Sequence, residues 1–94
     1  MALFDVGRLV TTPAALAFIA KHNVPIVEIL ARHLGGDFGD VSNHDKAANK
    51  RALVDGSRIF SAYKFKEGRI WIITEAVDDG GRRASTCVLL PEDY

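Results

Sequence analysis

Two histidines and three carboxylates lie close together in the sequence, and they are the first side chains that could carry chemistry. They are His33, Asp37, Asp40, His44 and Asp45. Imidazole and carboxylate groups together can hold a divalent metal, but this spacing matches no known metal-binding motif. His33 also falls on the apolar face of a predicted helix, where a histidine more often anchors neighbouring segments through hydrogen bonds. We therefore predict no metal site here, and a loop of structural or functional importance that involves His33, Asp37, Phe38 and Asp40.

The sequence offers little for nucleophilic catalysis. The single cysteine, Cys87, lies within a β-branched stretch that predicts a buried and inert thiol. Ser61 and Ser85 lack the flanking glycines of a nucleophile elbow, and no histidine follows His44. A Ser–His pair would have to form across the fold. We therefore predict no catalytic residues, no cofactor and no enzymatic activity, and we keep a small metal-dependent hydrolase at the His33–His44 cluster as an alternative.

The composition is that of one ordinary folded domain that spans residues 1–94. Of the 94 residues, 48% are apolar and 26% are charged, which is typical of globular proteins. Lys plus Arg equals Asp plus Glu at 12 each, so no overall positive field attracts nucleic acid or anionic lipid. No apolar run reaches the roughly 18–20 residues of a membrane span, and a lone cysteine fits a reducing compartment. These features predict a cytoplasmic protein without a membrane partner.

Residues 12–56 are predicted to be helical. Thr12-Pro13 is a good helix start, with threonine as N-cap and proline at the first helical position, so the first helix covers 13–22. Apolar residues at helical spacing predict a second helix that begins at Pro25 and ends before Gly35-Gly36. Ser42 followed by Asp45 resembles a capping box and predicts a third helix over 43–55.

Residues 58–90 are predicted to form an antiparallel meander of three strands over 58–66, 69–77 and 82–90. Glu67-Gly68 is the expected two-residue turn of the first hairpin, and residues 78–81 form the expected second turn. The fold class is therefore α+β, with three helices on one face of a three-stranded antiparallel sheet. A strand at 6–11 would make four. The face toward the helices is predicted to carry Tyr63, Phe65, Ile70, Ile72, Cys87 and Leu89.

The opposite face of this sheet, called the second face from here on, has an unusual predicted composition. Its apolar centre consists of Trp71, Ile73 and Val88, and its basic rim consists of Lys64, Lys66 and Arg69. Protein interfaces combine these features. Either the N-terminal strand or a helix covers this face within the monomer, or the face binds another protein or a second copy of the chain. A single tryptophan is a weak signal for single-stranded nucleic acid.

Several short stretches are informative in combination, because their order and spacing form one pattern. They are Arg8–Leu16, Arg32-His33, Gly36–Asp40, Ser61–Tyr63, Trp71–Ala76 and Leu89–Tyr94. In combination they resemble a family of small bacterial proteins carried on plasmids and other mobile elements, and the resemblance covers nearly the whole chain. It implies a fold and a genomic setting more than an activity, and it brings no established catalytic residues.

The expected function is that of a small non-enzymatic accessory protein of a mobile element, which acts by binding another protein in regulation or in countering host defence. The setting rests on the resemblance, whereas the binding role rests on the second face. Trp71, Ile73 and Val88 are expected to anchor the contact, and Lys64, Lys66 and Arg69 to orient it. A nucleic-acid-binding regulator that uses the same face is the first alternative.

Overall fold

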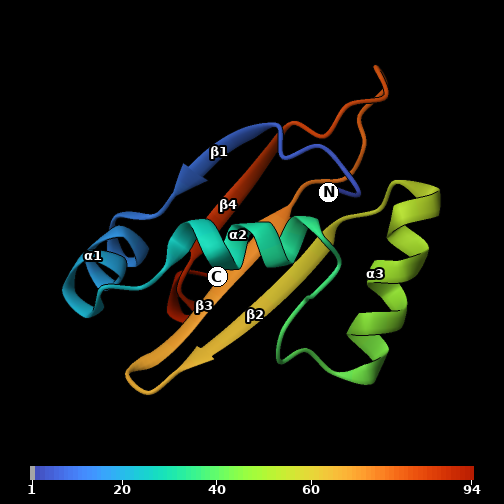
Figure 1. The fold of residues 1–94 in the computed structure, drawn as a ribbon. Coiled ribbons are helices and arrows are strands. Elements are labelled where there is room, and N and C mark those ends of the chain that lie inside the picture. Colours follow the sequence, from blue (N-terminus) through green and yellow to red (C-terminus); the bar gives the residue numbers. More distant parts are fainter. Residues whose placement is uncertain (1) are drawn as a thin grey trace.

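The computed structural model describes residues 2–94, which form a four-stranded sheet with three α-helices (Figure 1). The fold is α+β, as predicted. The strand order across the sheet is β1-β4-β3-β2. In chain order the elements are β1 (Arg8–Thr11), α1 (Pro13–His22), α2 (Ile26–Leu34), α3 (Asn43–Asp55), β2 (Ile59–Phe65), β3 (Gly68–Thr74), β4 (Ser85–Leu89) and the 3-10 helix η1 (Pro91–Asp93).

The N-terminal strand joins the sheet as its fourth member and makes the sheet mixed. β1 pairs with β4 in parallel, with Arg8 opposite Ser85 and Thr11 opposite Val88, whereas the other pairs are antiparallel. The prediction of a purely antiparallel sheet is therefore wrong at this edge. The reason is the connection between β1 and β4, which contains all three helices and two strands. Such a long path lets the strands run in the same direction, which a short turn does not.

Local signals place the ends of α1 and α3 where the sequence predicts them. The Thr12 hydroxyl accepts a hydrogen bond from the Ala15 N–H at 3.1 Å, and the Ser42 hydroxyl accepts one from the Asp45 N–H at 3.0 Å. Each bond satisfies an N–H group that the first helical turn leaves free. Gly56 ends α3 in the left-handed conformation, with a φ of 81°, which glycine adopts without steric cost.

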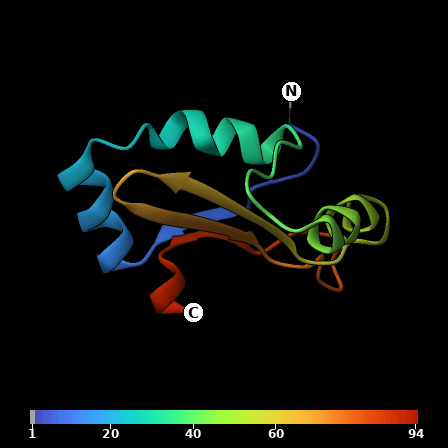
Figure 2. The ribbon, with the colours of Figure 1, turned by 90° about the horizontal axis from the view of Figure 1, so that it is seen from below.

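The three helices take different positions around the sheet (Figure 2). α2 lies across one face, called the helix face from here on, while α1 stands at the end of the sheet next to the end of β1, and both contact the main apolar core of β2, β3 and β4. α3 lies beside the outer edge of β2, so only α2, rather than all three helices, lies over the helix face. No helix of the described residues is by itself long and apolar enough to span a membrane, and α1 and α2 reach that length and composition only together, bent by 119°. The main core consists of Ala15, Val24, Ile29, Tyr63, Ile70, Ile72 and Val88.

The register of the sheet differs from the prediction in two places, with different consequences. Between β2 and β3, the turn uses Lys66-Glu67 instead of the predicted Glu67-Gly68, so Tyr63 lies opposite Ile70. This shift by two residues leaves every side chain on its predicted face. Between β3 and β4, the turn takes residues 78–82 instead of the predicted 78–81, so Ile72 lies opposite Val88. A shift by one residue moves every β4 side chain to the other face.

Candidate functional site

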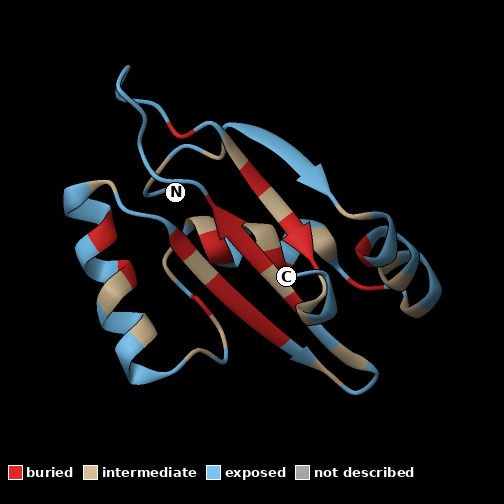
Figure 3. Cartoon of the chain, turned by 180° about the vertical axis from the view of Figure 1, so that it is seen from behind, coloured by how far each residue is buried: buried red, intermediate tan, exposed pale blue. Residues whose placement is uncertain are grey.

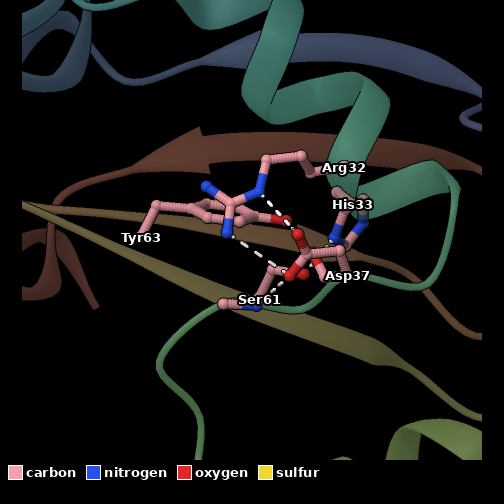
Figure 4. A network of polar contacts seen from close by, with 6 residues as sticks. Arg32, His33, Asp37, Ser61 and Tyr63 are labelled. Carbon is pink, nitrogen blue, oxygen red and sulfur yellow. Dashed lines mark hydrogen bonds and ion pairs between the residues drawn. The ribbon is translucent and has the colours of Figure 1, made fainter.

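The loop between α2 and α3 is held by contacts to α2 and to β2 (Figure 4). The Arg32 guanidinium binds the Asp37 carboxylate at 2.8 and 3.3 Å and lies 4.8 Å above the Tyr63 ring. Tyr63 in turn donates its hydroxyl proton to the Asp37 carbonyl at 2.7 Å. The hydrogen bond from Arg32 lowers the pKa of Asp37, and burial raises the pKa of Tyr63 to about 12. These bonds fix the shape of the loop.

His33 lies fully buried at the centre of a chain of hydrogen bonds whose direction can be assigned. The Thr86 hydroxyl donates to the Val6 carbonyl at 2.7 Å, so it accepts its second bond from Thr74, also at 2.7 Å. The Thr74 proton is then used, so Thr74 accepts from His33 Nε2 at 2.8 Å. The proton of a neutral His33 ring is therefore on Nε2, and Nδ1 then accepts from the Ser61 hydroxyl at 2.5 Å.

This geometry assigns the predicted His33 region a structural role. Burial lowers the pKa of His33 to about 4, so the ring is neutral at pH 7 and fits the hydrogen bonds with its proton on Nε2. Ser61 and His33 do form a Ser–His pair across the fold, but both side chains have 0% exposure and no substrate reaches them. Phe38 is buried against Ala52 and Ile59. The structural alternative for this loop is therefore the one that the contacts support.

The carboxylates and histidines of positions 33–45 do not assemble into a metal site. His33 uses both ring nitrogens inside the core, and Asp37 is paired with Arg32. Asp40 and His44 are exposed. Among residues 2–94, no three His, Cys, Asp or Glu side chains lie close enough to hold an ion. The hydrolase alternative therefore has no assembled site in the described part of the chain.

The second face differs from its prediction because of the shifted register of β4. Val88 lies on the helix face and is part of the main core, with 2% exposure, so the prediction that it anchors a contact on the second face is wrong. Cys87 and Leu89 were predicted on the helix face and lie on the second face instead. Cys87 is half-buried there, and burial raises the pKa of its thiol.

The C-terminal segment, residues 90–94, covers the middle of the second face (Figure 2). The sequence predicts an N-terminal strand or a helix as the cover within the monomer. Asp93 accepts hydrogen bonds from the Thr12 hydroxyl at 2.6 Å and from the Leu90 N–H at 3.0 Å, which fold the segment back onto the sheet. Tyr94 then contacts Trp71 edge to face, with ring centroids 5.8 Å apart. Arg58 donates to the Tyr94 hydroxyl at 2.9 Å. Leu89, on the same face, is 6% exposed.

A groove of about 310 Å³ remains open between α3 and the C-terminal segment. We call it the aromatic groove, because three aromatic side chains line it. Trp71 lines the groove and is half-buried, with the Phe60 ring 5.0 Å away in an edge-to-face contact. Ile73 is largely buried in the wall. The complete lining is Asp45, Ala48, Asn49, Arg58, Phe60, Trp71, Ile73 and Tyr94.

The three predicted basic residues are all exposed, but they occupy two different places. Lys64 and Arg69 lie directly opposite each other on the second face, and both share that face with Trp71. Lys66 lies in the β2–β3 turn. The structure therefore brings together Trp71, Ile73, Lys64 and Arg69, while it places Lys66 beyond the strand end and Val88 on the other side of the sheet.

Six lining residues of the groove were not predicted as part of a binding surface: Asp45, Ala48, Asn49, Arg58, Phe60 and Tyr94. Phe60 could have been found, because it alternates with Ala62 and Lys64 and so falls on the face of Trp71. Arg58 falls on the same face by the same alternation, whereas Tyr94 carries no such signal, since its position depends on the way in which the C-terminal segment folds back. Comparison with protein-family models, with curated proteins and with solved structures finds no match to this chain.

Proposed function

We propose that this chain is a non-enzymatic binding protein, and that its aromatic groove holds a segment of another protein that combines an apolar side chain with acidic residues. The observation that carries the proposal is the half-exposed Trp71 in a groove that no long helix covers. Partly buried aromatic side chains in such a setting supply most of the binding energy in many interfaces. The groove also extends below the surface of the sheet face, since the largely buried Ile73 forms part of its wall.

The charge pattern beside the groove supports an acidic partner. Lys64 and Arg69 are exposed cross-strand neighbours, and like charges in that position destabilise a sheet. Neither side chain forms an ion pair within residues 2–94. Carboxylates of a bound segment would relieve the repulsion close to an apolar side chain seated on Trp71, because Lys64 and Trp71 are diagonal neighbours on the sheet, about 7–8 Å apart.

The broader role follows from the resemblance noted above. An accessory protein of a mobile element, acting in regulation or against host defence, needs a surface for one partner and no catalytic site. Part of our proposal is therefore that the partner is a host or element protein with an exposed acidic segment. The aromatic groove and the pair Lys64 and Arg69 are the features we assign to that contact.

Single-stranded nucleic acid is the second candidate, because the groove holds Phe60 and Tyr94 beside Trp71. Aromatic platforms with nearby cations are used to stack bases. The formal net charge of zero and the carboxylate of Asp45 in the groove lining favour the protein partner. The two candidates differ in their salt dependence, since binding to phosphates weakens steeply as salt is raised.

A selection from a library of random displayed peptides tests this function. We expect the folded protein to enrich peptides with one large apolar residue flanked by Asp or Glu. Trp71→Ala should weaken their binding about tenfold or more, and Lys64→Glu should weaken it as well. Val54→Ala is the matched control, because Val54 is also an exposed apolar residue but lies on α3 outside the groove.

Two results would overturn the proposal. One is the enrichment of peptides whose binding is the same in wild type and in a correctly folded Trp71→Ala variant. The other is a lack of enriched peptides together with strongly salt-dependent binding of single-stranded oligonucleotides, which would favour the nucleic-acid candidate.

A further inference from the structure

The two edges of the sheet differ in how far their backbone groups are covered. At the β2 edge, Ala62 accepts from the Asp40 N–H at 2.7 Å and donates to the Phe38 carbonyl at 3.0 Å. Asn49 covers the next position, with one hydrogen bond to the Phe60 carbonyl at 2.7 Å and one from its N–H at 3.0 Å. β1 at the opposite edge is exposed at all four residues (Figure 3). An exposed strand edge is a template for another strand.

The hydrogen bonds between β1 and β4 show which backbone groups point outward. Arg8 N–H donates to Ala84 and Thr12 N–H donates to Val88, both at 3.0 Å. In a parallel pair, alternate residues of a strand bond to the same neighbour. The N–H and carbonyl groups of Leu9 and Thr11 therefore face away from the sheet. Leu9 and Val10 are also among the exposed large apolar residues, at 51% and 37% exposure.

These outward groups are self-complementary in one antiparallel register. If Leu9 of one copy lies opposite Thr11 of a second copy, each pair exchanges both of its N–H···O bonds. The two-fold axis then passes beside Val10, which faces the Val10 side chain of the second copy. The added strand also covers Leu9 at the rim of an apolar cavity of about 230 Å³ between β1, α1 and α2. An interface of this kind uses the same patch on both copies.

Charge complementarity favours a second copy over an unrelated strand. In this register Arg8 lies opposite Thr12 of the second copy, whose hydroxyl is bonded to Asp93 at 2.6 Å. Arg8 is exposed and forms no ion pair within residues 2–94. Because Arg8 lies opposite Ser85, its side chain is on the second face, where the C-terminal segment carries Asp93. The symmetry creates the same Arg8–Asp93 contact at both ends of the strand pair.

We propose that this chain forms a two-fold symmetric dimer through antiparallel pairing of β1, which joins two four-stranded sheets into one. This surface is separate from the aromatic groove, so the dimer does not depend on the function proposed above. It leaves Trp71, Lys64 and Arg69 available to another protein in each copy.

Cysteine cross-linking tests the register directly. In a Cys87→Ala background, Val10→Cys places the two introduced cysteines opposite each other in a non-hydrogen-bonded pair. The Cα atoms of such a pair are about 4.5 Å apart, a separation that a disulfide can span. We expect mild oxidation to give a covalent dimer much faster than Val54→Cys in the same background, because Val54 is exposed on α3 away from β1. Equal rates for the two variants would overturn the proposed register.

Charge exchange tests the ion pairs in the dimer without a covalent bond. Arg8→Asp and Asp93→Arg should each weaken dimerisation about tenfold or more, whereas an equimolar mixture should restore it, because both ends of the mixed dimer regain opposite charges. Sedimentation measures the dimerisation of the wild type and of Thr11→Pro, whose proline lacks the outward N–H. These two values are the reference for the charge variants. A wild type that stays monomeric up to about 1 mM, or a mixture no tighter than the single variants, would overturn the dimer.

Discussion

His33 makes the stability of the fold depend on pH. Its pKa is lowered to about 4 by burial, whereas the unfolded value is about 6.5. Between these two values the unfolded chain binds a proton that the folded chain does not. The stabilisation is therefore complete above about pH 6.5 and is lost progressively as the pH falls toward 4, by on the order of 3 kcal/mol.

Urea unfolding between pH 7 and pH 4 measures this contribution. We expect His33→Gln to be less stable than the wild type at pH 7 and to lose less stability on acidification. His44→Gln provides the control, because His44 is exposed at the start of α3 and should leave the wild-type pH dependence unchanged. The same slope in His33→Gln and the wild type would contradict the assignment.

Arg83 has a similar buried role at the end of α3, where its guanidinium binds three backbone carbonyls. It donates to Ser57 at 2.7 Å, to Glu75 at 3.0 Å and to Ala52 at 3.1 Å, and it is only 7% exposed. Arg83→Met leaves these acceptors without a partner and should cost about 2–4 kcal/mol of unfolding free energy. Arg82→Met, at the exposed neighbouring position, should change stability by less than about 0.5 kcal/mol. Comparable losses in chemical denaturation of both variants would rule out this role.

At the scale of the elements, helix ends were predictable and strand register was not. Thr12-Pro13, Ser42 and Gly56 act within one helical turn, so the local sequence determines where α1 and α3 begin and where α3 ends. The β3–β4 register depends on whether one further residue joins a turn. There the Asp78 carboxylate binds the Gly80 and Arg82 N–H groups, and this local choice moved Val88 from the predicted site into the core.

The loop that follows α2 also depends on a contact with a distant strand. The Gly39 backbone approaches β2 so closely that a Cβ atom would lie 2.1 Å from the Ala62 carbonyl oxygen. Gly39→Ala must therefore move the loop away from the β2 edge. Gly81→Ala is a matched control, because Gly81 has nearly the same φ, 77° against 73°, and nothing within 4 Å of the added carbon.

Both variants place an alanine in the left-handed region, which lowers the free energy of unfolding by about 1–2 kcal/mol. Gly39→Ala should lower the free energy of unfolding by about 2 kcal/mol more, because the loop hydrogen bonds to Ala62 are disturbed as well. Thermal unfolding with amide exchange at Ala62 measures both effects. Equal destabilisation of the two variants, with Ala62 still protected, would mean that the loop tolerates the added methyl group.

At the scale of the whole molecule, the C-terminal segment connects parts of the chain that are far apart in sequence. It reaches the junction of β1 and α1 through Asp93 and Thr12, and the start of β2 through Tyr94 and Arg58. It also contacts Trp71 in β3. The same segment that closes the second face therefore forms one wall of the aromatic groove, so its position decides how much of Trp71 a partner can reach.

Quenching of Trp71 fluorescence tests this control of access, because Trp71 is the only tryptophan of the chain. Tyr94→Ala removes the ring that packs on one side of Trp71, so acrylamide should quench the emission more strongly than in the wild type. The unfolding free energy should fall by no more than about 1 kcal/mol, since the Tyr94 side chain is 69% exposed. Leu53→Ala, at an exposed position of α3 outside the groove, should leave quenching unchanged. Unaltered quenching in Tyr94→Ala would mean that Phe60 and α3 alone set the access to Trp71, and the C-terminal segment would then have no part in binding.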